Sequence, residues 1–348
     1  MRRLACALMF VFAWMSCSVL AAPVTRLPIK SLYVLGDSLS DQGNLLAATT
    51  ALGAPSHQPG VPDELHYFEG RFSNGVNYVD ALADRLGISV TPSLAGGTNF
   101  AFGGARTTYN VVEQPFGPYP QGAFPWSLNA ETAAFVAQTG NRQADPTALF
   151  VVFSGSNDLA DVLSLRLSPA TTIATTVDGI RQAILAFKAA GARTILVPNL
   201  PDLGKIPLVT QNGPAVAAFA TALSEQYNAA LDAMLDTIEG VNIIRFDTFA
   251  FITDVVDNPT AYGFTNSTDA CYSGFVTPDP TATECADPDA HVFWDGEHPT
   301  SKLYSLLADE LYTSVLQCQA AGNGRAGDVD DDAAHQRGFV SHCRVNGH

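Results

Sequence analysis

A serine, a histidine and an aspartate stand where they can form a nucleophile and its base. Ser38 lies in residues 36–44 (GDSLSDQGN), directly after a short apolar run. Asp295 and His298 lie three residues apart in residues 293–299 (FWDGEHP). A serine hydroxyl is a weak nucleophile at neutral pH and needs a base. On a turn, the Asp295 carboxylate can reach Nδ1 of His298 and leave Nε2 free toward Ser38, which predicts nucleophilic catalysis.

Among the histidines of the chain, His298 is the strongest candidate for the base. Pro299 suits the first position of the helix expected to follow it. His291, beside Asp289, is the rival, but no helix start follows it. The remaining histidines lie in a loop or near the carboxyl end: His57, His66, His335, His342 and His348.

Two further segments supply hydrogen-bond donors for a developing oxyanion. Residues 99–105 (NFAFGGA) contain two glycines whose backbone N–H groups can approach a ligand closely. Residues 155–158 (GSND) add the amide side chain of Asn157 after a second apolar run. Each segment alone is a common loop element. Together with the N–H of Ser38 they predict an oxyanion hole.

The elements that must position these residues alternate between strands and helices. Short apolar runs at 31–35, 148–153, 194–197 and 241–246 predict buried strands. Apolar residues at helical spacing predict helices over 171–190, 215–238 and 301–316. This alternation indicates an α/β fold with a mostly parallel sheet covered on both faces. Ligands then bind at the carboxyl ends of the strands, and the Gly-, Pro- and aromatic-rich segments 53–75, 107–127 and 257–290 are expected to be long loops around the site.

The amino-terminal residues 1–22 predict a cleavable signal peptide. Two arginines precede an apolar run, and small residues offer a cut after Ala21 or Ala22. The alternative is a membrane anchor, but the run of about 17 residues is short for a span. The expected localisation is therefore secreted or periplasmic.

Cysteine usage agrees with export. Four cysteines follow the signal segment, which predicts two disulfides with three possible pairings. The favoured pairing is Cys271 with Cys285, which closes a loop, and Cys318 with Cys343, which ties down the carboxyl-terminal segment. Zinc binding is disfavoured because no CxxC spacing or nearby histidine pair is present.

Composition narrows the class of partner. The chain has 348 residues and a formal net charge of −16, with 18 Lys plus Arg against 34 Asp plus Glu. Such a chain repels phosphate backbones, which argues against nucleic-acid binding. No linker or internal repeat divides the chain, so we expect one hydrolase domain over residues 23–318 and a polar tail over residues 319–348.

Five sequence blocks, taken in order, resemble one family. They are residues 36–44, 70–75 (GRFSNG), 99–105, 155–158 and 293–299. The chain resembles the GDSL, or SGNH, family of esterases and lipases, and is nearer to its phospholipase/lecithinase/haemolysin-like branch. The resemblance implies a three-layer α/β/α sandwich of the flavodoxin-like type, and ester hydrolysis through an acyl-serine without cofactor or metal.

The resemblance also implies a role for individual residues. Ser38 is the nucleophile and first oxyanion donor, Asp295 and His298 complete the triad, and Asn157 supplies the third donor. Gly104 supplies the second donor, or the preceding glycine if the alignment shifts by one. Residues 71–74 either shape the substrate mouth or anchor loops to each other.

The sequence as a whole predicts a secreted serine esterase or lipase. Its expected substrates are small-molecule or lipid esters, including phospholipids, with transient contact at a membrane surface. A lipid acyltransferase or a carbohydrate acetylesterase would use the same site. A non-catalytic secreted binding module would require a broken triad, and no break is visible.

Overall fold

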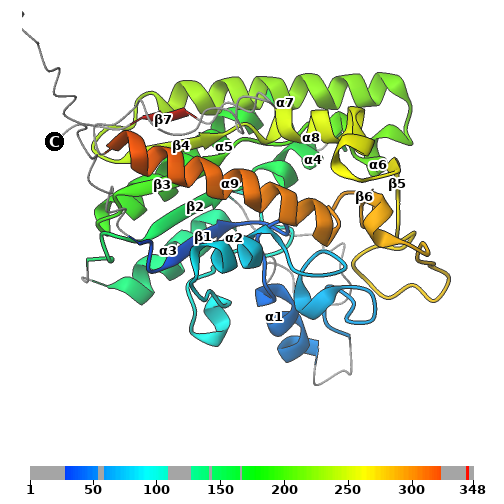
Figure 1. Ribbon diagram of the computed structural model, residues 1–348, viewed down its shortest axis with the longest axis horizontal. Coiled ribbons are helices and arrows are strands. Elements are labelled where there is room, and N and C mark those ends of the chain that lie inside the picture. Colours follow the sequence, from blue (N-terminus) through cyan, green and yellow to red (C-terminus); the bar gives the residue numbers. More distant parts are fainter. Residues whose placement is uncertain are drawn as a thin grey trace, which may run out of the picture.

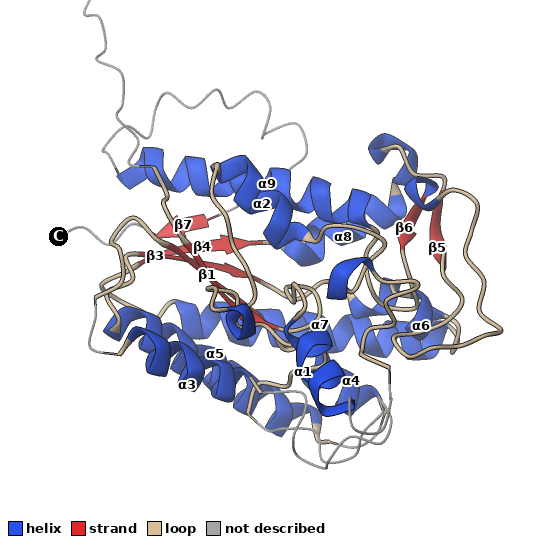
Figure 2. Cartoon of the chain, turned by 90° about the horizontal axis from the view of Figure 1, so that it is seen from below, coloured by secondary structure: helices blue, strands red, loops and turns tan. Residues whose placement is uncertain are grey.

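The computed structural model describes residues 28–53, 59–108, 127–140, 143–164, 167–322 and 342–344. The expected signal peptide lies outside these residues, as does most of the expected tail. Within them, a central sheet lies between two groups of helices (Figures 1 and 2). This confirms the α/β/α architecture expected from the sequence.

Four parallel strands form the body of the central sheet, and their spatial order follows the sequence. They are β1 (Leu32–Gly36), β2 (Leu149–Phe153), β3 (Thr194–Pro198) and β4 (Asn242–Phe246). The register sets Val34 opposite Val151. All of β2 and nearly all of β1 are buried, as a sheet covered on both faces requires. The strands agree with the four apolar runs to within one residue at each end.

Segments that the apolar runs did not reveal extend the sheet at both edges. β7 (His342–Arg344) pairs antiparallel with β4, so part of the expected tail belongs to the sheet. At the opposite edge, residues 98–100 run parallel to β1, and the N–H of Phe100 donates to the carbonyl of Val34 at 2.8 Å. This pairing places the glycine block beside the turn that follows β1.

Helices cover both faces of the sheet (Figure 2). One face carries α3 (Leu128–Thr139), α5 (Pro169–Ala189) and α7 (Pro214–Leu235), and the other carries α2 (Tyr78–Leu86), α8 (Thr248–Asp257) and α9 (Ser301–Gly322). The expected stripe of α5 is buried at Ile173, Val177, Ile180 and Ile184. Shorter helices lie near the carboxyl ends of the strands: α1 (Asn44–Gly53), α4 (Ser156–Leu163) and α6 (Pro207–Thr210). Among the described helices, none combines the length and apolarity that a membrane crossing requires.

A second hydrophobic cluster is separate from the core around the central sheet, and we call it the aromatic cluster. Its buried members are Leu45, Ala48, Val61, Tyr67, Phe72, Phe102, Ala105, Cys271, Tyr272, Val276 and Trp294. A small pair of parallel strands, β5 (Asn266–Ala270) and β6 (His291–Phe293), leads into it. The cluster therefore joins the loops that follow α1 to the loops that follow β5 and β6.

Two disulfides join described residues, in the pairing favoured from the sequence. Cys271 and Cys285, 14 residues apart, close a loop of the aromatic cluster. Cys318 and Cys343, 25 residues apart, link α9 to β7. The second bond explains how a three-residue strand is retained at the sheet edge: its covalent partner lies on the helix that packs against it.

Candidate active site

The structure brings the predicted serine, histidine and aspartate together. Ser38 lies in the turn after β1, whereas Asp295 and His298 lie in the turn between β6 and α9. Ser38 Oγ is 2.9 Å from His298 Nε2, and His298 Nδ1 is 2.7 Å from Asp295 Oδ2. Asp295 and His298 are buried, and Ser38 keeps 9% of its surface exposed. The geometry is that of a serine nucleophile with an oriented base.

The turn that carries the base also orients the carboxylate. Oδ1 of Asp295 accepts hydrogen bonds from the backbone N–H groups of Glu297 at 2.9 Å and His298 at 2.7 Å. Oδ2 accepts from Nδ1 of His298 and from the hydroxyl of Tyr67, which donates at 2.6 Å. Because Nδ1–H is donated to the carboxylate, Nε2 is the nitrogen that can accept the serine proton.

The buried carboxylate also sets the charge state of the base. Burial alone would lower the pKa of His298, but the negative charge of Asp295 and the hydrogen bond to it outweigh burial and raise that pKa to about 9. Burial alone would raise the pKa of Asp295, but His298 and the hydroxyl of Tyr67 hold it below its usual value. The pair therefore stabilises a proton on the imidazole, as a general base must.

A buried carboxylate holds the nucleophile turn in place. Asp41 accepts hydrogen bonds, between 2.7 and 3.1 Å, from the backbone N–H groups of Gly43, Asn44, Leu45 and Gly103. Burial raises the pKa of Asp41 to about 6, although these hydrogen bonds oppose the rise. One side chain thereby ties the start of α1 to the glycine block.

Two buried asparagines complete this support. The side chain of Asn44 donates to the carbonyls of Asn99 at 2.8 Å and Ala101 at 3.0 Å. The side chain of Asn99 donates to the carbonyl of Ser40 at 2.7 Å. The polar residues of the first and third sequence blocks therefore hydrogen-bond mainly to backbone, and they fix the two loops relative to each other.

The expected oxyanion donors come from loops at this same end of the sheet. The N–H of Gly103 already donates to Asp41, whereas that of Gly104, at φ +75°, engages no acceptor among the described residues. Asn157, in the first turn of α4, donates from Nδ2 to the carbonyl of Ala105 at 3.1 Å. That bond orients the amide and leaves its second N–H available. The arrangement favours Gly104 over Gly103 as a donor.

A cavity of about 410 Å³, which we call the catalytic chamber, opens onto the nucleophile and the base. Its polar lining includes Ser38, Asn157 and His298; Gly104 is not among the lining residues. Its apolar walls come from the nucleophile turn, α4, the loop after β3, α6 and α7: Leu39, Ala160, Leu163, Leu203, Ile206, Leu208, Val209 and Val216. The chamber is therefore suited to an apolar group attached to a polar reacting centre.

Sequence reasoning missed the aromatic side chains around the base. The ring centroid of Phe72 lies 5.1 Å from that of His298, and the ring of Phe275 stacks on the imidazole at 6.1 Å. Tyr67 is buried and reaches Asp295 from a different loop. The available signal was the aromatic enrichment of segments 53–75 and 257–290, which indicates loops around a site but no individual contact.

The segment at residues 71–74 anchors loops. The hydroxyl of Ser73 donates to the carbonyl of Pro299 at 2.8 Å. Oδ1 of Asn74 accepts the backbone N–H of Ser301, the first residue of α9, at 2.9 Å. Both bonds hold the chain directly after His298. Of the two roles considered for this segment, the contacts support the anchor.

Two buried carboxyl groups flank the nucleophile turn. Oε2 of Glu131 accepts the N–H of Gly36 at 2.9 Å, and Oδ1 of Asp37 accepts the N–H of Leu39 at 3.1 Å. Burial raises the pKa of Asp37 to about 7 and that of Glu131 well above its usual value. Burial thus favours their uncharged forms, which limits negative charge beside the place where an oxyanion would develop.

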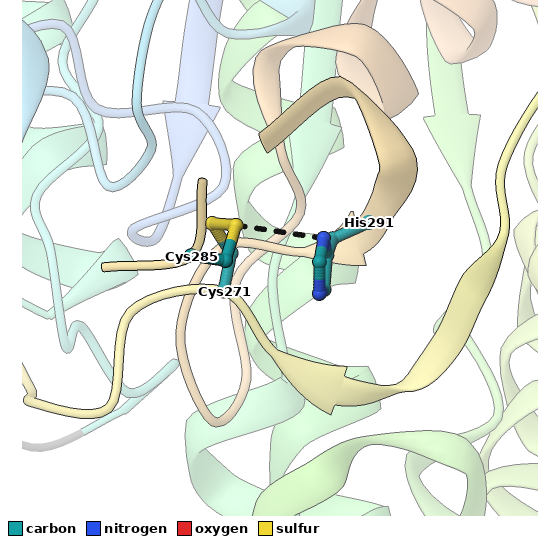
Figure 3. A group of neighbouring side chains, drawn as sticks. All are labelled: Cys271, Cys285 and His291. Carbon is teal, nitrogen blue, oxygen red and sulfur yellow. Dashed lines mark hydrogen bonds between the residues drawn. A yellow bond between two sulfur atoms is a disulfide. The ribbon is translucent and has the colours of Figure 1, made fainter. Parts of the chain in front are cut away.

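The rival histidine, His291, lies beside a disulfide (Figure 3). Its Nδ1 is 3.0 Å from the carbonyl of Asp287 and 3.5 Å from Sγ of Cys285. Cys271, Cys285 and His291 are close enough to suggest a metal site. Both sulfur atoms belong to the disulfide, however, so this group offers one histidine nitrogen and no thiolate.

The fold and this geometry are typical of a hydrolase with a serine, histidine and aspartate site, and the comparisons specify the family. The model of the GDSL-like lipase/acylhydrolase family matches residues 32–311. Two GDSL esterase/lipases of Arabidopsis thaliana are 28% identical to this chain over 326 and 323 residues, covering 82% and 80% of it and 86% and 85% of themselves. A third from the same plant is 26% identical over 331 residues, covering 81% of this chain and 86% of itself. The chain belongs to the GDSL-like lipase/acylhydrolase family and is a carboxylic ester hydrolase.

Proposed function

We propose that this protein is a secreted serine esterase that hydrolyses esters of apolar acyl chains, acyl lipids among them, through an acyl-Ser38 intermediate. The observation that carries the proposal is the 2.9 Å approach of Ser38 Oγ to a histidine that Asp295 orients. Export is supported by the signal-like residues 1–22 and by the two disulfides.

The reaction follows from the positions of the groups. His298 Nε2 accepts the proton of Ser38 as Oγ attacks the ester carbonyl carbon. The N–H groups of Ser38, Gly104 and Asn157 stabilise the resulting oxyanion. When the intermediate collapses, His298 returns the proton to the departing alcohol, and the acyl group stays on Ser38. A water molecule then attacks the acyl-serine with the same histidine as base, which releases the acid and restores the serine.

The catalytic chamber favours a long acyl group over acetyl. Its volume of about 410 Å³ falls within the roughly 300–1,000 Å³ of small-ligand pockets and far exceeds what a two-carbon acyl group fills. Its walls are mostly apolar, so each buried methylene stabilises the complex by about 0.8 kcal/mol. We therefore expect activity to rise from acetyl to medium-length acyl esters.

Replacing the nucleophile tests the proposal. Ser38→Ala should lower kcat for p-nitrophenyl esters by on the order of 10⁴-fold or more, while the circular dichroism spectrum stays unchanged. A fluorophosphonate should add its mass at Ser38, detected by peptide mass spectrometry. Ser154→Ala is the matched control. Ser154 is a buried serine directly after β2; it is not among the lining residues of the catalytic chamber and is not a member of the triad. Activity retained by Ser38→Ala would disprove the assignment.

A further inference from the structure

A second chamber of about 670 Å³ lies next to the catalytic chamber. Leu208 lines both chambers. The second chamber also touches Phe275, whose ring stacks on the imidazole of His298, and Gly296, which belongs to the catalytic turn. The N–H of Leu208 donates to the carbonyl of Gly296 at 2.7 Å, so α6 is fixed to that turn. One aromatic ring and one turn therefore separate the second chamber from the base.

The two chambers differ in chemistry. The catalytic chamber has mostly apolar walls, whereas much of the second chamber is lined by hydroxyl, amide and carboxylate groups: Thr210, Gln211, Thr268, Asp269, Tyr272, Ser273 and Asp279. Neither Lys nor Arg is among the described lining residues. Such a lining suits a ligand with several hydroxyl groups, and it would repel a phosphate or a carboxylate.

Tyr272 gives a second, independent indication of a ligand. The residue is fully buried, and its hydroxyl has no hydrogen-bond partner among the described residues. His66 and Trp294 stack on its ring at 4.4 and 5.6 Å, and Tyr272 is one of the residues that line the chamber. The hydroxyl lies against Gly274, another lining residue. A buried polar group without a partner is costly, and a ligand hydroxyl in the chamber would supply that partner.

We propose that the second chamber binds the alcohol part of the ester, and that this alcohol is a neutral polyol such as glycerol or a sugar. The inference rests on the proposed function, because a leaving alcohol must lie beside the histidine that protonates it. The acyl chain occupies the catalytic chamber, and the alcohol extends past Phe275 into the second chamber. Its hydroxyl groups donate to Asp269 and Asp279, and one of them pairs with Tyr272.

Esters that share one acyl chain separate the two proposals. The test uses the mature protein with its disulfides intact, and decanoyl esters of glycerol, methanol, choline and glycerol 3-phosphate. We expect kcat/KM for the glycerol ester to exceed that for the methyl ester about tenfold or more, because hydrogen bonds to charged groups are the strong ones. The phosphate-bearing ester should be the poorest substrate.

Variants of the lining then assign the effect to the second chamber. Asp269→Ala and Asp279→Ala should each lower the glycerol-to-methyl ratio of kcat/KM several-fold. Tyr272→Phe should lower the same ratio without lowering Tm, since the lost hydroxyl has no hydrogen-bond partner among the described residues. Asp289→Ala is the matched control: it is exposed nearby and is not among the described lining residues of either chamber. Its ratio should equal that of the wild type.

Each other outcome has a definite meaning. Equal kcat/KM for the glycerol and methyl esters, unchanged by the variants, would overturn the alcohol site and leave the esterase proposal standing. A preference for the choline ester that Asp269→Asn and Asp279→Asn abolish would also overturn the polyol, in favour of a cationic alcohol. Failure of the wild-type protein to hydrolyse any of the four esters would overturn the proposed function itself.

Discussion

Both halves of the candidate active site are held by hydrogen bonds, but the half around His298 adds aromatic packing and a disulfide. Around Ser38, the buried polar side chains of Asp41, Asn44 and Asn99 hydrogen-bond to the backbone. Around His298, hydrogen bonds to Asp295 and Pro299 are supplemented by the packing of two aromatic rings on the imidazole and by the nearby Cys271–Cys285 disulfide. Ser38 thus lies in the turn after β1 of the central sheet, whereas His298 lies beside the aromatic cluster.

This difference indicates how Ser38, Asp295 and His298 are brought together. Hydrogen bonds are directional and leave a costly unpaired group when broken. Loss of one buried polar side chain near Ser38 should therefore destabilise the whole turn. Around His298, aromatic packing, which is less directional, adds to the hydrogen bonds, so the fold should tolerate the loss of one contact there better. We therefore expect substitutions near Ser38 to lower the free energy of unfolding first. Substitutions near His298 should lower kcat/KM first.

The largest effect on stability should come from Asp41→Ala. The substitution leaves four N–H groups without their acceptor, including those of Gly43 and Gly103. We expect the free energy of unfolding to fall by about 3–5 kcal/mol, as when a buried charged partner is removed. Urea denaturation measures this. Asp178→Ala, which removes an exposed ion-pair partner of Arg181, should change it by less than about 0.5 kcal/mol. A loss below about 1 kcal/mol for Asp41→Ala would contradict the central role of this carboxylate.

The disulfides provide the next comparison. Removing Cys271–Cys285 or Cys318–Cys343 by paired Ser substitutions should each cost about 3 kcal/mol, since both close loops of moderate length. Only the first loop carries Phe275, which stacks on the imidazole of His298. The first pair of substitutions should therefore also lower kcat/KM at temperatures where the protein remains folded, and the second should not. Equal kcat/KM for both variants would show that the loop does not position the base.

The same contrast explains what the sequence could predict. Asp295 and His298 lie within one turn and Ser38 directly follows a buried strand, so local sequence determines how each is presented. The strands of the central sheet could be predicted because their residues are apolar and buried on both faces. The contact of Tyr67 with Asp295 could not be predicted, because the two residues lie 228 positions apart and the contact depends on how two loops pack.

Other features escaped prediction for related reasons. β7 has three residues, His342–Arg344, without an apolar run, and it is defined by its pairing with β4 and by a disulfide. The second chamber is formed by α6, β5 and the loop of Cys271–Cys285, which are distant in sequence. Features made by one local segment are thus predictable, whereas those made where two segments meet require the structure.

The pH dependence of kcat/KM tests the half of the site around His298. Because the pKa of His298 is raised to about 9 and the base must be neutral, kcat/KM should rise about tenfold per pH unit below that value, or about a hundredfold between pH 6 and 8. The stabilising pairing of charged His298 is fully present below about pH 6.5 and is lost as pH rises through about 9. Activity should therefore rise while this contribution to stability falls. Initial rates with one ester between pH 6 and 10 measure the profile, and a plateau already reached at pH 7 would contradict it.

The smallest expected effect, and the most specific, comes from Tyr67→Phe. The change removes the hydroxyl that donates to Oδ2 of Asp295 at 2.6 Å and keeps the ring in the aromatic cluster. With one donor lost, the carboxylate attracts the imidazole proton more strongly, so the pKa of His298 should rise and the pH profile should shift upward. We expect kcat to fall about tenfold, the loss of about 1.4 kcal/mol that one hydrogen bond to a charged group represents, with KM little changed. Tyr262→Phe is the matched control, because Tyr262 is also a buried tyrosine that donates to a carboxylate, that of Asp254, away from the site. Both variants should lose similar stability, and only Tyr67→Phe should move the pH profile. If the two profiles coincide, Tyr67 supports the packing of the aromatic cluster and does not act on His298 through Asp295.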